Sequence, residues 1–330
     1  MNHTKPHIVG VGNALVDVVA PVDHDVIGRH GLAPGGMHLV DAEAAHALFD
    51  DVGPGFRQSG GSVANSIAHM ADIGLRGTYL GKIADDDLGR TFREEMSGMG
   101  IAAPVAEGPA DEIGTGRCVV LVTPDGERTM STHLGAAVTL APSDISAGQF
   151  EGCDILFIEG YLWDAPQGPA VVEAATRFAK TAGARIALTP SDPGCVDRNR
   201  DGMLGFITDH ADILIGNHVE IGALAGQDDT AAALEWAIGH VGIAAVTESE
   251  KGSLVSDGGE PVHIEAVPVA KVVDSTGAGD AYASGFLSGL ARGLDIAECG
   301  RRGATLAARV LSHFGAREGA AARAVSLPAA

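Results

Sequence analysis

An α/β fold with a mainly parallel sheet is predicted, because short apolar segments alternate with helical patterns along most of the chain. Buried strands are expected at residues 7–13, 154–160, 185–190, 212–217 and 243–249. Residues 169–183 and 230–242 carry apolar side chains at helical spacing between these strands. Helices on both faces of such a sheet would bury the strands from both sides. Ligands in these folds gather at the carboxyl ends of the strands, which here carry small or polar residues.

Composition and charge narrow the classes of partner. The 330 residues are 45% hydrophobic and have a net charge of −21, which disfavours nucleic acids and anionic membranes as partners. The four cysteines form no C-x-x-C pair, and we expect them to be reduced thiols of a cytoplasmic protein. The sequence contains no apolar run of the roughly 20 residues that a membrane span needs. A small-molecule ligand remains compatible with this composition, because it needs only a local positive site.

Two segments interrupt the α/β alternation. Residues 15–23 and 37–41 predict strands joined by a Gly/Pro turn, and residues 116–134 predict a hairpin around "PDGE". A small β unit covering the ligand face would account for both segments. Such a lid would exclude water from a reacting group.

The segment "VVDSTGAGDAYASGFLSGLARG", residues 272–293, predicts the end of a strand, a glycine loop and an apolar helix. Free backbone N–H groups and the helix dipole make such a loop an anion site. Asp280 in this position has two interpretations. It is either the N-cap of the helix or a general base that deprotonates a hydroxyl facing a phosphate.

Two further motifs lie in the N-terminal part of the chain. The segment "GGSVANSIAHMADIG", residues 60–74, predicts a helix with Ser62 as N-cap and Asn65 in its first turn. The segment "GNALVDV", residues 12–18, predicts a strand with Asn13, Leu15 and Asp17 on one face. A half-exposed strand would give the same alternation, but so would a pocket wall that binds hydroxyl groups and a flat apolar ring.

Taken together, "DSTGAGD", "GGSVANSI" and "GNHVE" (residues 216–220) resemble the motifs of ribokinase-like (PfkB-type) carbohydrate and nucleoside kinases. The resemblance covers residues 7–317. It implies one kinase domain over residues 1–330, built as a three-layer α/β/α sandwich with a β lid from segments near 14–41 and 113–135. It also implies ATP, Mg²⁺ and transfer of the γ-phosphate to a primary hydroxyl, in a monomer or a homodimer.

The N-terminal third is most similar to the adenosine kinase branch of this family, with "GNALVDVVAPVD" followed by "HGLAPGGMHLVD". This similarity implies ribose contacts for one set of residues, Asn13, Asp17, Gly60, Gly61 and Asn65. It implies a base pocket lined by Leu15, Leu39, Leu134 and Ala136, with Tyr161 stacking on the base. Arg128, on the predicted hairpin of residues 116–134, matches a lid arginine that in the family reaches the phosphates.

The family mechanism implies roles for the remaining motif residues. The backbone N–H groups of Gly277, Ala278, Gly279 and Asp280 would stabilise charge on the transferred phosphoryl group, while Asp280 accepts the proton of the attacking hydroxyl. The nucleotide would be held by Asn217, Thr247, Gly252, Thr276 and Gly279. A water-bridged magnesium contact is expected from Glu220. Asp274 and Thr276 lie where some members of the family bind a monovalent cation, so the resemblance implies such a cation as a further ligand.

The sequence also departs from the family pattern. The nucleotide segment "TESEKGS" keeps only Gly252 of a Gly-rich motif, and Ala14 and Met37 stand where proline and a polar residue are frequent. Three hypotheses follow. The chain is a purine nucleoside kinase acting on adenosine in preference, a sugar kinase of the same family, or a nucleotide-binding protein that has lost catalysis.

Overall fold

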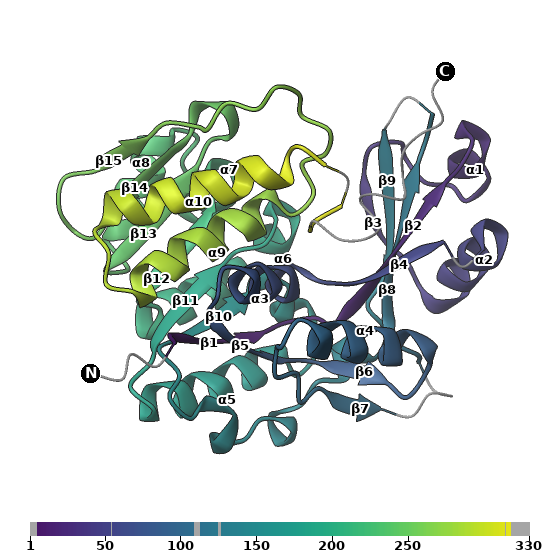
Figure 1. The fold of residues 1–330 in the computed structure, drawn as a ribbon, viewed down its shortest axis with the longest axis horizontal. Coiled ribbons are helices and arrows are strands. Elements are labelled where there is room, and N and C mark those ends of the chain that lie inside the picture. The colour runs from purple at the N-terminus through teal and green to yellow at the C-terminus, as the bar shows by residue number, and fades with distance from the viewer. Residues whose placement is uncertain (1–4, 54, 109–112, 125–126, 314, 318–330) are drawn as a thin grey trace.

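The computed structural model describes residues 5–53, 55–108, 113–124, 127–313 and 315–317. An eight-stranded sheet runs through its larger part (Figure 1) in the order β15-β14-β13-β12-β11-β10-β1-β5. Six of these strands are parallel: β5 (Arg76–Leu80), β1 (His7–Val11), β10 (Ile155–Glu159), β11 (Arg185–Thr189), β12 (Ile213–Asn217) and β13 (Ile243–Thr247). The antiparallel strands β14 (Ser253–Ser256) and β15 (Val262–Ile264) extend one edge.

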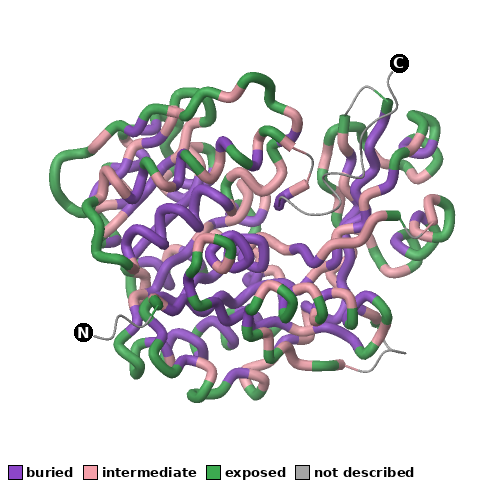
Figure 2. Tube along the Cα trace, viewed as in Figure 1, coloured by how far each residue is buried: buried purple, intermediate pink, exposed green. Residues whose placement is uncertain are grey.

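Helices cover both faces of this sheet, because successive residues of each strand point in opposite directions. On one face, Ile8 and Phe157 share a buried cluster with α3 (Ser62–Asp72), α4 (Asp87–Gly98), α9 (Ala278–Ala291) and α10 (Ile296–Val310). On the other face, Val9 and Leu156 share one with α5 (Gly168–Thr181), α6 (Pro193–His210), α7 (His218–Ala225) and α8 (Thr230–Ile238). The buried sections of the tube lie along the strands and the helices packed on them (Figure 2).

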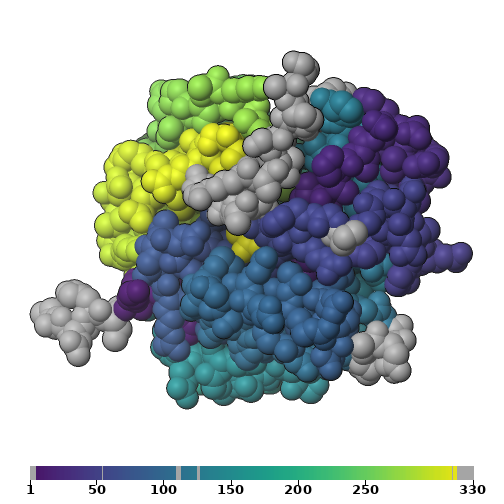
Figure 3. Space-filling model, turned by 45° about the vertical axis from the view of Figure 1, so that its right-hand side comes forward, coloured from purple at the N-terminus to yellow at the C-terminus, as the bar shows by residue number. Residues whose placement is uncertain are grey.

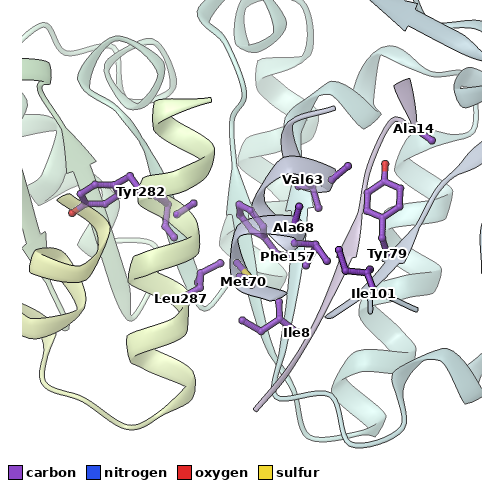
Figure 4. Close-up of a cluster of buried hydrophobic side chains, with 14 of the residues drawn as sticks. Ile8, Ala14, Val63, Ala68, Met70, Tyr79, Ile101, Phe157, Tyr282 and Leu287 are labelled. Carbon is purple, nitrogen blue, oxygen red and sulfur yellow. The ribbon is translucent and has the colours of Figure 1, made fainter. Parts of the chain in front are cut away.

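The first of these clusters joins helices α3 and α9. Figure 4 shows Met70 of α3 between Leu287 of α9 and Ile8 of β1, and all three side chains are fully buried. The two helices therefore have fixed positions relative to the sheet. Their N-terminal ends both lie beside Asp280, as the contacts given below show.

A second sheet of five strands has the order β3-β9-β8-β2-β4. Its strands are β2 (Leu15–Pro21), β3 (Met37–Leu39), β4 (Phe56–Gly60), β8 (Gly116–Val122) and β9 (Arg128–His133). Helices α1 (His24–Arg29) and α2 (Ala42–Val52) belong to the same part of the chain. In Figure 3 the purple segments of this part, which include α1 and α2, lie on the right of the molecule, and α10, in yellow, lies on the left. Strands β6 (Lys82–Ala84) and β7 (Ala106–Gly108) form a separate pair.

The α/β architecture predicted from the sequence is confirmed, with a large mainly parallel sheet between two layers of helices and a smaller second sheet. The predicted hairpin is also present, because β8 and β9 pair in antiparallel fashion and Thr123 N donates to Glu127 O at 3.0 Å. Its two turn residues, Asp125 and Gly126, lie outside the described residues.

Three local predictions are wrong. Residues 15–23 and 37–41 are not joined by a simple turn, because α1 lies between them and β3 pairs with β9 rather than with β2. Residues 272 and 273 belong to no strand, and Val272 is 55% exposed. The N-cap of α3 is Gly61 rather than Ser62. A membrane-crossing helix, long and apolar enough to span a bilayer, is absent from the part of the chain that the structure describes.

Candidate active site

Two cavities open where the parallel strands end. The first, of ≈ 240 Å³, is bounded by β2, β3, β8 and β9 of the second sheet together with α3 and the end of β10. We call it the acceptor cavity. The second, of ≈ 80 Å³, is bounded by the ends of β11, β12 and β13 and by the first turn of α9. We call it the donor cavity.

The two cavities share three residues, Ser62, Ser191 and Asp280. They therefore meet at the Asp280 carboxylate. A group held in either cavity can lie beside these side chains, so Asp280 is placed to act on both.

Asp280 is the third residue of α9, so it is not the N-cap; that position is taken by Gly277. The Ser62 hydroxyl donates to Asp280 Oδ1 at 2.6 Å, and the Asn65 amide donates to Oδ2 at 3.4 Å. Burial raises the pKa of Asp280 to about 6, against the lowering effect of these two donors. A carboxylate with a pKa in this range is basic enough to accept a proton from a hydroxyl group and is still mostly ionised at neutral pH.

The first turn of α9 provides backbone donors beside this carboxylate. Gly277 has the left-handed φ of 76°, and a Cβ atom there would lie 2.6 Å from the Cβ of Ala316. By contrast, a Cβ atom on Gly279 would meet no protein atom within 4 Å. The N–H groups of Gly279 and Asp280 have no carbonyl four residues back within the helix, whereas Ala278 N donates to Ser275 O at 3.2 Å. Open space therefore lies beside Gly279 at the positive end of the helix dipole.

The acceptor cavity has a polar side and an apolar side. Asn13, Asp17 and Asn65 line it, and the Oδ1 atoms of both asparagines are buried without a hydrogen-bond partner among the described residues. Burial raises the pKa of Asp17 to about 6. The apolar side contains Leu15, Met37, Leu39, Cys118, Met130 and Leu134. Unpaired buried acceptors are costly, so this arrangement suits a ligand that donates hydrogen bonds from hydroxyl groups.

Tyr161 and Gly61 also line the acceptor cavity. Tyr161 belongs to a short 3₁₀ turn after β10, and its backbone N–H donates to Ser191 Oγ at 3.3 Å. Burial raises the pKa of its phenol well above the usual value, so the ring stays neutral. A neutral aromatic ring at the edge of a cavity can stack on a flat ligand.

Asn217 and Glu220 face each other on the donor side. Asn217 Oδ1 accepts from Glu220 N at 2.8 Å, and Glu220 accepts from Asn217 N at 3.0 Å and from Asn217 Nδ2 at 2.7 Å. This capping box starts α7, and both residues line the donor cavity with Thr247 and Gly279. Burial raises the pKa of Glu220 to about 8. Among the described residues no group of three or more His, Cys, Asp or Glu side chains could hold a metal directly.

Arg128 does not line either cavity. Its guanidinium pairs with the buried Asp274 carboxylate and donates to Thr276 Oγ1 at 3.3 Å. Asp274 also accepts from Thr276 N at 3.0 Å and from Gly315 N at 2.8 Å. Thr276 Oγ1 donates to the same carboxylate at 2.9 Å, so a monovalent cation at Asp274 would compete with four donors already bound there. The side chain of Thr276 itself lines the acceptor cavity.

Five other predicted residues also line neither cavity: Gly277 and Ala278 at the start of α9, and Ala136, Gly252 and Gly60. Ala136 is buried in a 3₁₀ turn and donates its N–H to Gly114 O. Gly252 closes the turn between β13 and β14, where its N–H donates to Ser249 O at 3.1 Å. Gly60 ends β4 opposite Leu15.

Sequence reasoning missed two residues at the site. Glu159 is 1% exposed, and its carboxylate accepts from Asn13 N at 2.7 Å and from Val63 N at 3.0 Å. It therefore joins the end of β1 to the start of α3, and burial raises its pKa to about 7. Ser191 is shared by both cavities and has a φ of 80°. An acidic residue at the end of the apolar strand "ILFIE" is the signal that could have found Glu159.

The two N–H groups held by Glu159 predict that Glu159→Gln is destabilising. Its amide has one oxygen, so its NH₂ group must face the N–H of Asn13 or of Val63. We expect the free energy of unfolding to fall by about 1–3 kcal/mol at pH 8, where the native carboxylate is ionised. Urea denaturation of both proteins at this pH measures the difference, and equal stability would contradict the bridging role.

The pKa of Asp280 predicts the acid side of the pH profile for catalysis. A base must be deprotonated to act, and the folded-state pKa is about 6, so kcat/KM should rise as pH increases through this value. Steady-state rates between pH 5 and 8 measure the profile, with the fold checked by circular dichroism at each pH. A rate that increases on acidification in this range would contradict the assignment of Asp280 as a base.

Comparisons with known proteins identify the family. The model for "pfkB family carbohydrate kinase" matches residues 55–323. The structure named adenosine kinase from Sinorhizobium meliloti is 37% identical, with a TM-score of 0.87 over 97% of this chain and 98% of that one. The "probable sugar kinase protein" from Rhizobium etli CFN 42 is 35% identical, with a TM-score of 0.88 and the same two coverages. Adenosine kinase from Saccharomyces cerevisiae is 28% identical over 94% of this chain and 96% of its own length.

These similarities cover nearly the whole chain and include the three motifs at the meeting point of the cavities. The chain belongs to the PfkB family of carbohydrate kinases and is a ribokinase-like phosphotransferase that acts on a hydroxyl group.

Proposed function

We propose that this kinase transfers the γ-phosphate of ATP to the 5′-hydroxyl of a purine nucleoside, with adenosine as the preferred acceptor. The observation that carries the proposal is the position of Asp280 where the donor and acceptor cavities meet. A hydroxyl held in the acceptor cavity would face both the carboxylate and the first turn of α9. This is the arrangement that in-line phosphoryl transfer requires.

The acceptor cavity supports a nucleoside on two grounds. Asn13 Oδ1 and Asn65 Oδ1, which have no hydrogen-bond partner in the part of the chain that the structure describes, would accept from the ribose hydroxyls together with the Asp17 carboxylate. The leucines and methionines of the second sheet would cover a flat base opposite Tyr161. A 5′-hydroxyl would then be the group nearest to Asp280. The similarity to two proteins named adenosine kinase favours adenosine among the purine nucleosides.

The residues of the chain would divide the chemistry as follows. Asp280 would accept the proton of the attacking hydroxyl. The side chains of Ser62 and Asn65 hold the two carboxylate oxygens of Asp280 in place. The backbone N–H groups of Gly279 and Asp280 would stabilise negative charge on the transferred group. The second sheet would exclude water, which is the competing acceptor.

The donor cavity, of ≈ 80 Å³, would take the terminal phosphate of a nucleotide and its metal ion rather than the whole nucleotide. It is lined by the side chains of Asn217, Glu220 and Thr247 and by open space beside Gly279. Glu220 and Asn217 would hold Mg²⁺ through water, since oxygen ligands suit this ion and it keeps part of its hydration shell. When bound, Mg²⁺ would neutralise phosphate charge beside the carboxylate of Asp280.

A second candidate is a sugar kinase, favoured by the 35% identity with the Rhizobium etli protein. A free sugar would use the same Asp280 and the same donor cavity. It would leave the apolar side of the acceptor cavity facing water, because a sugar has no flat ring to cover it. This difference disfavours the second candidate.

The test is phosphate transfer from ATP–Mg²⁺ to a panel of purine and pyrimidine nucleosides and free sugars. The proposal predicts the highest kcat/KM for adenosine and a lower value for free ribose. Leu39→Asp, which places a charge on the apolar side, should raise KM for adenosine more than KM for any sugar. The purine nucleoside proposal fails if free sugars alone are phosphorylated.

A further inference from the structure

Arg317 is a buried cation for which the proposed mechanism has no use. It lies beyond the last helix, yet it is only 4% exposed. Its guanidinium donates to Ser59 O and, at 2.9 Å, to Ser59 Oγ, and it lies 3.8 Å from the Glu95 carboxylate. Burying a guanidinium is costly unless it is paired and hydrogen-bonded, so these contacts indicate a specific place for it.

The chain on either side of Arg317 is held by elements of the active site. Ala316 O lies 2.9 Å from His69 Nε2 on α3, and Gly315 N donates to Asp274 in the loop before α9. A short segment after α10 therefore bridges α3, the α9 loop and β4 of the second sheet. In Figure 1 the chain after α10 passes between the large sheet and the second sheet.

The contact with Ser59 fixes the backbone at a critical junction. Ser59 is followed by Gly60, which ends β4, and by Gly61, which caps α3 and lines the acceptor cavity. A shift of Ser59 would move the start of α3, which carries the Ser62 and Asn65 side chains that hold Asp280. Small displacements of this kind are expensive for catalysis.

The charge of Arg317 also acts on the site. It lowers the pKa of Asp17 and the pKa of Asp280, in both cases against burial, which raises them. Glu95 acts on Asp17 in the opposite direction and raises its pKa. Arg317 and Glu95 therefore form a buried pair whose two charges have opposite effects on one ribose-binding carboxylate.

We propose that Arg317 is a positioning residue of the acceptor site, which fixes the β4–α3 junction through the two contacts of its guanidinium to Ser59. The inference rests on the proposed function, since it assigns Asp17 and Asp280 to acceptor binding and proton transfer. It accounts for a buried arginine that holds Ser59 and whose charge acts on two buried carboxylates. The ion pair with Glu95 alone would not require a place beside the acceptor cavity.

The groups that face the two carboxylates come from several elements. Asp17 on β2 interacts with Arg317, with Glu95 on α4 and with Asp280. The groups around Asp280 are Ser62, Asn65, Asp17, Arg317, Glu159 and Glu220. Arg317 is a cation that acts on both carboxylates, so its removal should raise both pKa values.

The test compares Arg317→Gln, Arg317→Lys and Glu95→Gln, with Arg309→Gln as a control at an exposed arginine of α10. KM, kcat and the acid side of the kcat/KM profile are measured for the best acceptor of the panel. We expect Arg317→Gln to lower kcat/KM by about 10- to 100-fold and to move the acid limb up by about one pH unit. Arg317→Lys should return the acid side of the kcat/KM profile to the pH found for the unsubstituted protein. Its KM for the acceptor should stay raised, because an ammonium group cannot match the two contacts to Ser59.

The direction in which Glu95→Gln shifts the acid side of the kcat/KM profile decides between the two explanations. Glu95 raises the pKa of Asp17, so its loss should move to lower pH the contribution of Asp17 to the acid side of the kcat/KM profile, opposite to Arg317→Gln. A purely structural pair would lose stability in both variants without opposite shifts, since Glu95 also accepts from Ser59 N at 2.6 Å. Should Arg317→Gln fail to fold, the downward shift in Glu95→Gln and the raised KM in Arg317→Lys decide the question. Unshifted limbs in the folded variants and an unchanged KM in Arg317→Lys would overturn the inference.

The proposed function fails independently of this result. Its failure appears in the unsubstituted protein, as phosphorylation of sugars instead of nucleosides. Failure of the Arg317 inference appears when the kcat/KM and KM of each variant are divided by those of the unsubstituted protein. These values are measured with whichever acceptor the panel identifies. Asp280 is the expected base for either acceptor class, so the ratio can be measured in both cases.

Discussion

Asp280→Asn is expected to lower kcat by about 10²- to 10⁴-fold, the usual contribution of a general base. Asparagine cannot accept the proton of the attacking hydroxyl, yet it preserves the size of the side chain. Its Oδ1 can still accept from Ser62, which donates to Asp280 at 2.6 Å. Binding of the acceptor should therefore persist, and the protein should stay folded.

Asp17→Asn is the matched control, because Asp17 also lines the acceptor cavity and also has a pKa raised to about 6. We expect this variant to raise KM for the acceptor with a smaller effect on kcat, as a binding residue would. Steady-state kinetics and calorimetric titration of the acceptor measure both proteins. A normal kcat in Asp280→Asn would contradict the assigned base.

Gly279→Ala is expected to lower kcat by about 10²-fold without loss of stability. Its Cβ atom would meet no protein atom within 4 Å, and alanine is favoured over glycine in a helix by about 1 kcal/mol. The same atom would occupy the open space beside the first turn of α9. There it would obstruct a phosphoryl group approaching the N–H donors, and the loss of one such donor costs about 10²–10³-fold.

Gly277→Ala is the contrasting variant. Gly277 has a φ of 76°, and the Cβ atom of an alanine at this position would lie 2.6 Å from the Cβ of Ala316. We expect this variant to lose stability, by about 1–3 kcal/mol for the strained backbone. Thermal unfolding and kcat are measured for both glycine variants. A fully active Gly279→Ala protein would show that the open space is not used by the reacting phosphate.

Local sequence patterns were sufficient to predict the structure wherever the contacts that determine it join residues close together in the chain. The alternation of Asn13, Leu15 and Asp17 against Ala14, Val16 and Val18 is confirmed, since the second set is fully buried and the first lines a cavity. The glycine loop before an apolar helix is likewise present, with Gly277 as N-cap. Both features depend on the period of a strand or on the geometry of a helix end.

Contacts between distant parts of the chain could not be predicted in this way. The Ser62 hydroxyl has the ordinary preference for an N-cap, but it donates to Asp280, 218 residues away, and leaves the cap to Gly61. Val272 and Val273 have strand propensity, yet they belong to no strand, and Val273 N donates to Leu311 O at 2.8 Å after α10. Arg317 contacts Ser59, 258 residues away, and nothing in the local sequence indicates its burial.

The central claim is that a hydroxyl in the acceptor cavity attacks a phosphate held beside α9, with Asp280 as its base. The most direct measurement is the position of the phosphate in the product formed from adenosine and ATP–Mg²⁺, determined by phosphorus NMR, for the unsubstituted protein and for Asp280→Asn. We expect the 5′-monophosphate from the unsubstituted protein and almost none from the variant. A phosphate on another hydroxyl, or equal amounts of product from both proteins, would contradict the account.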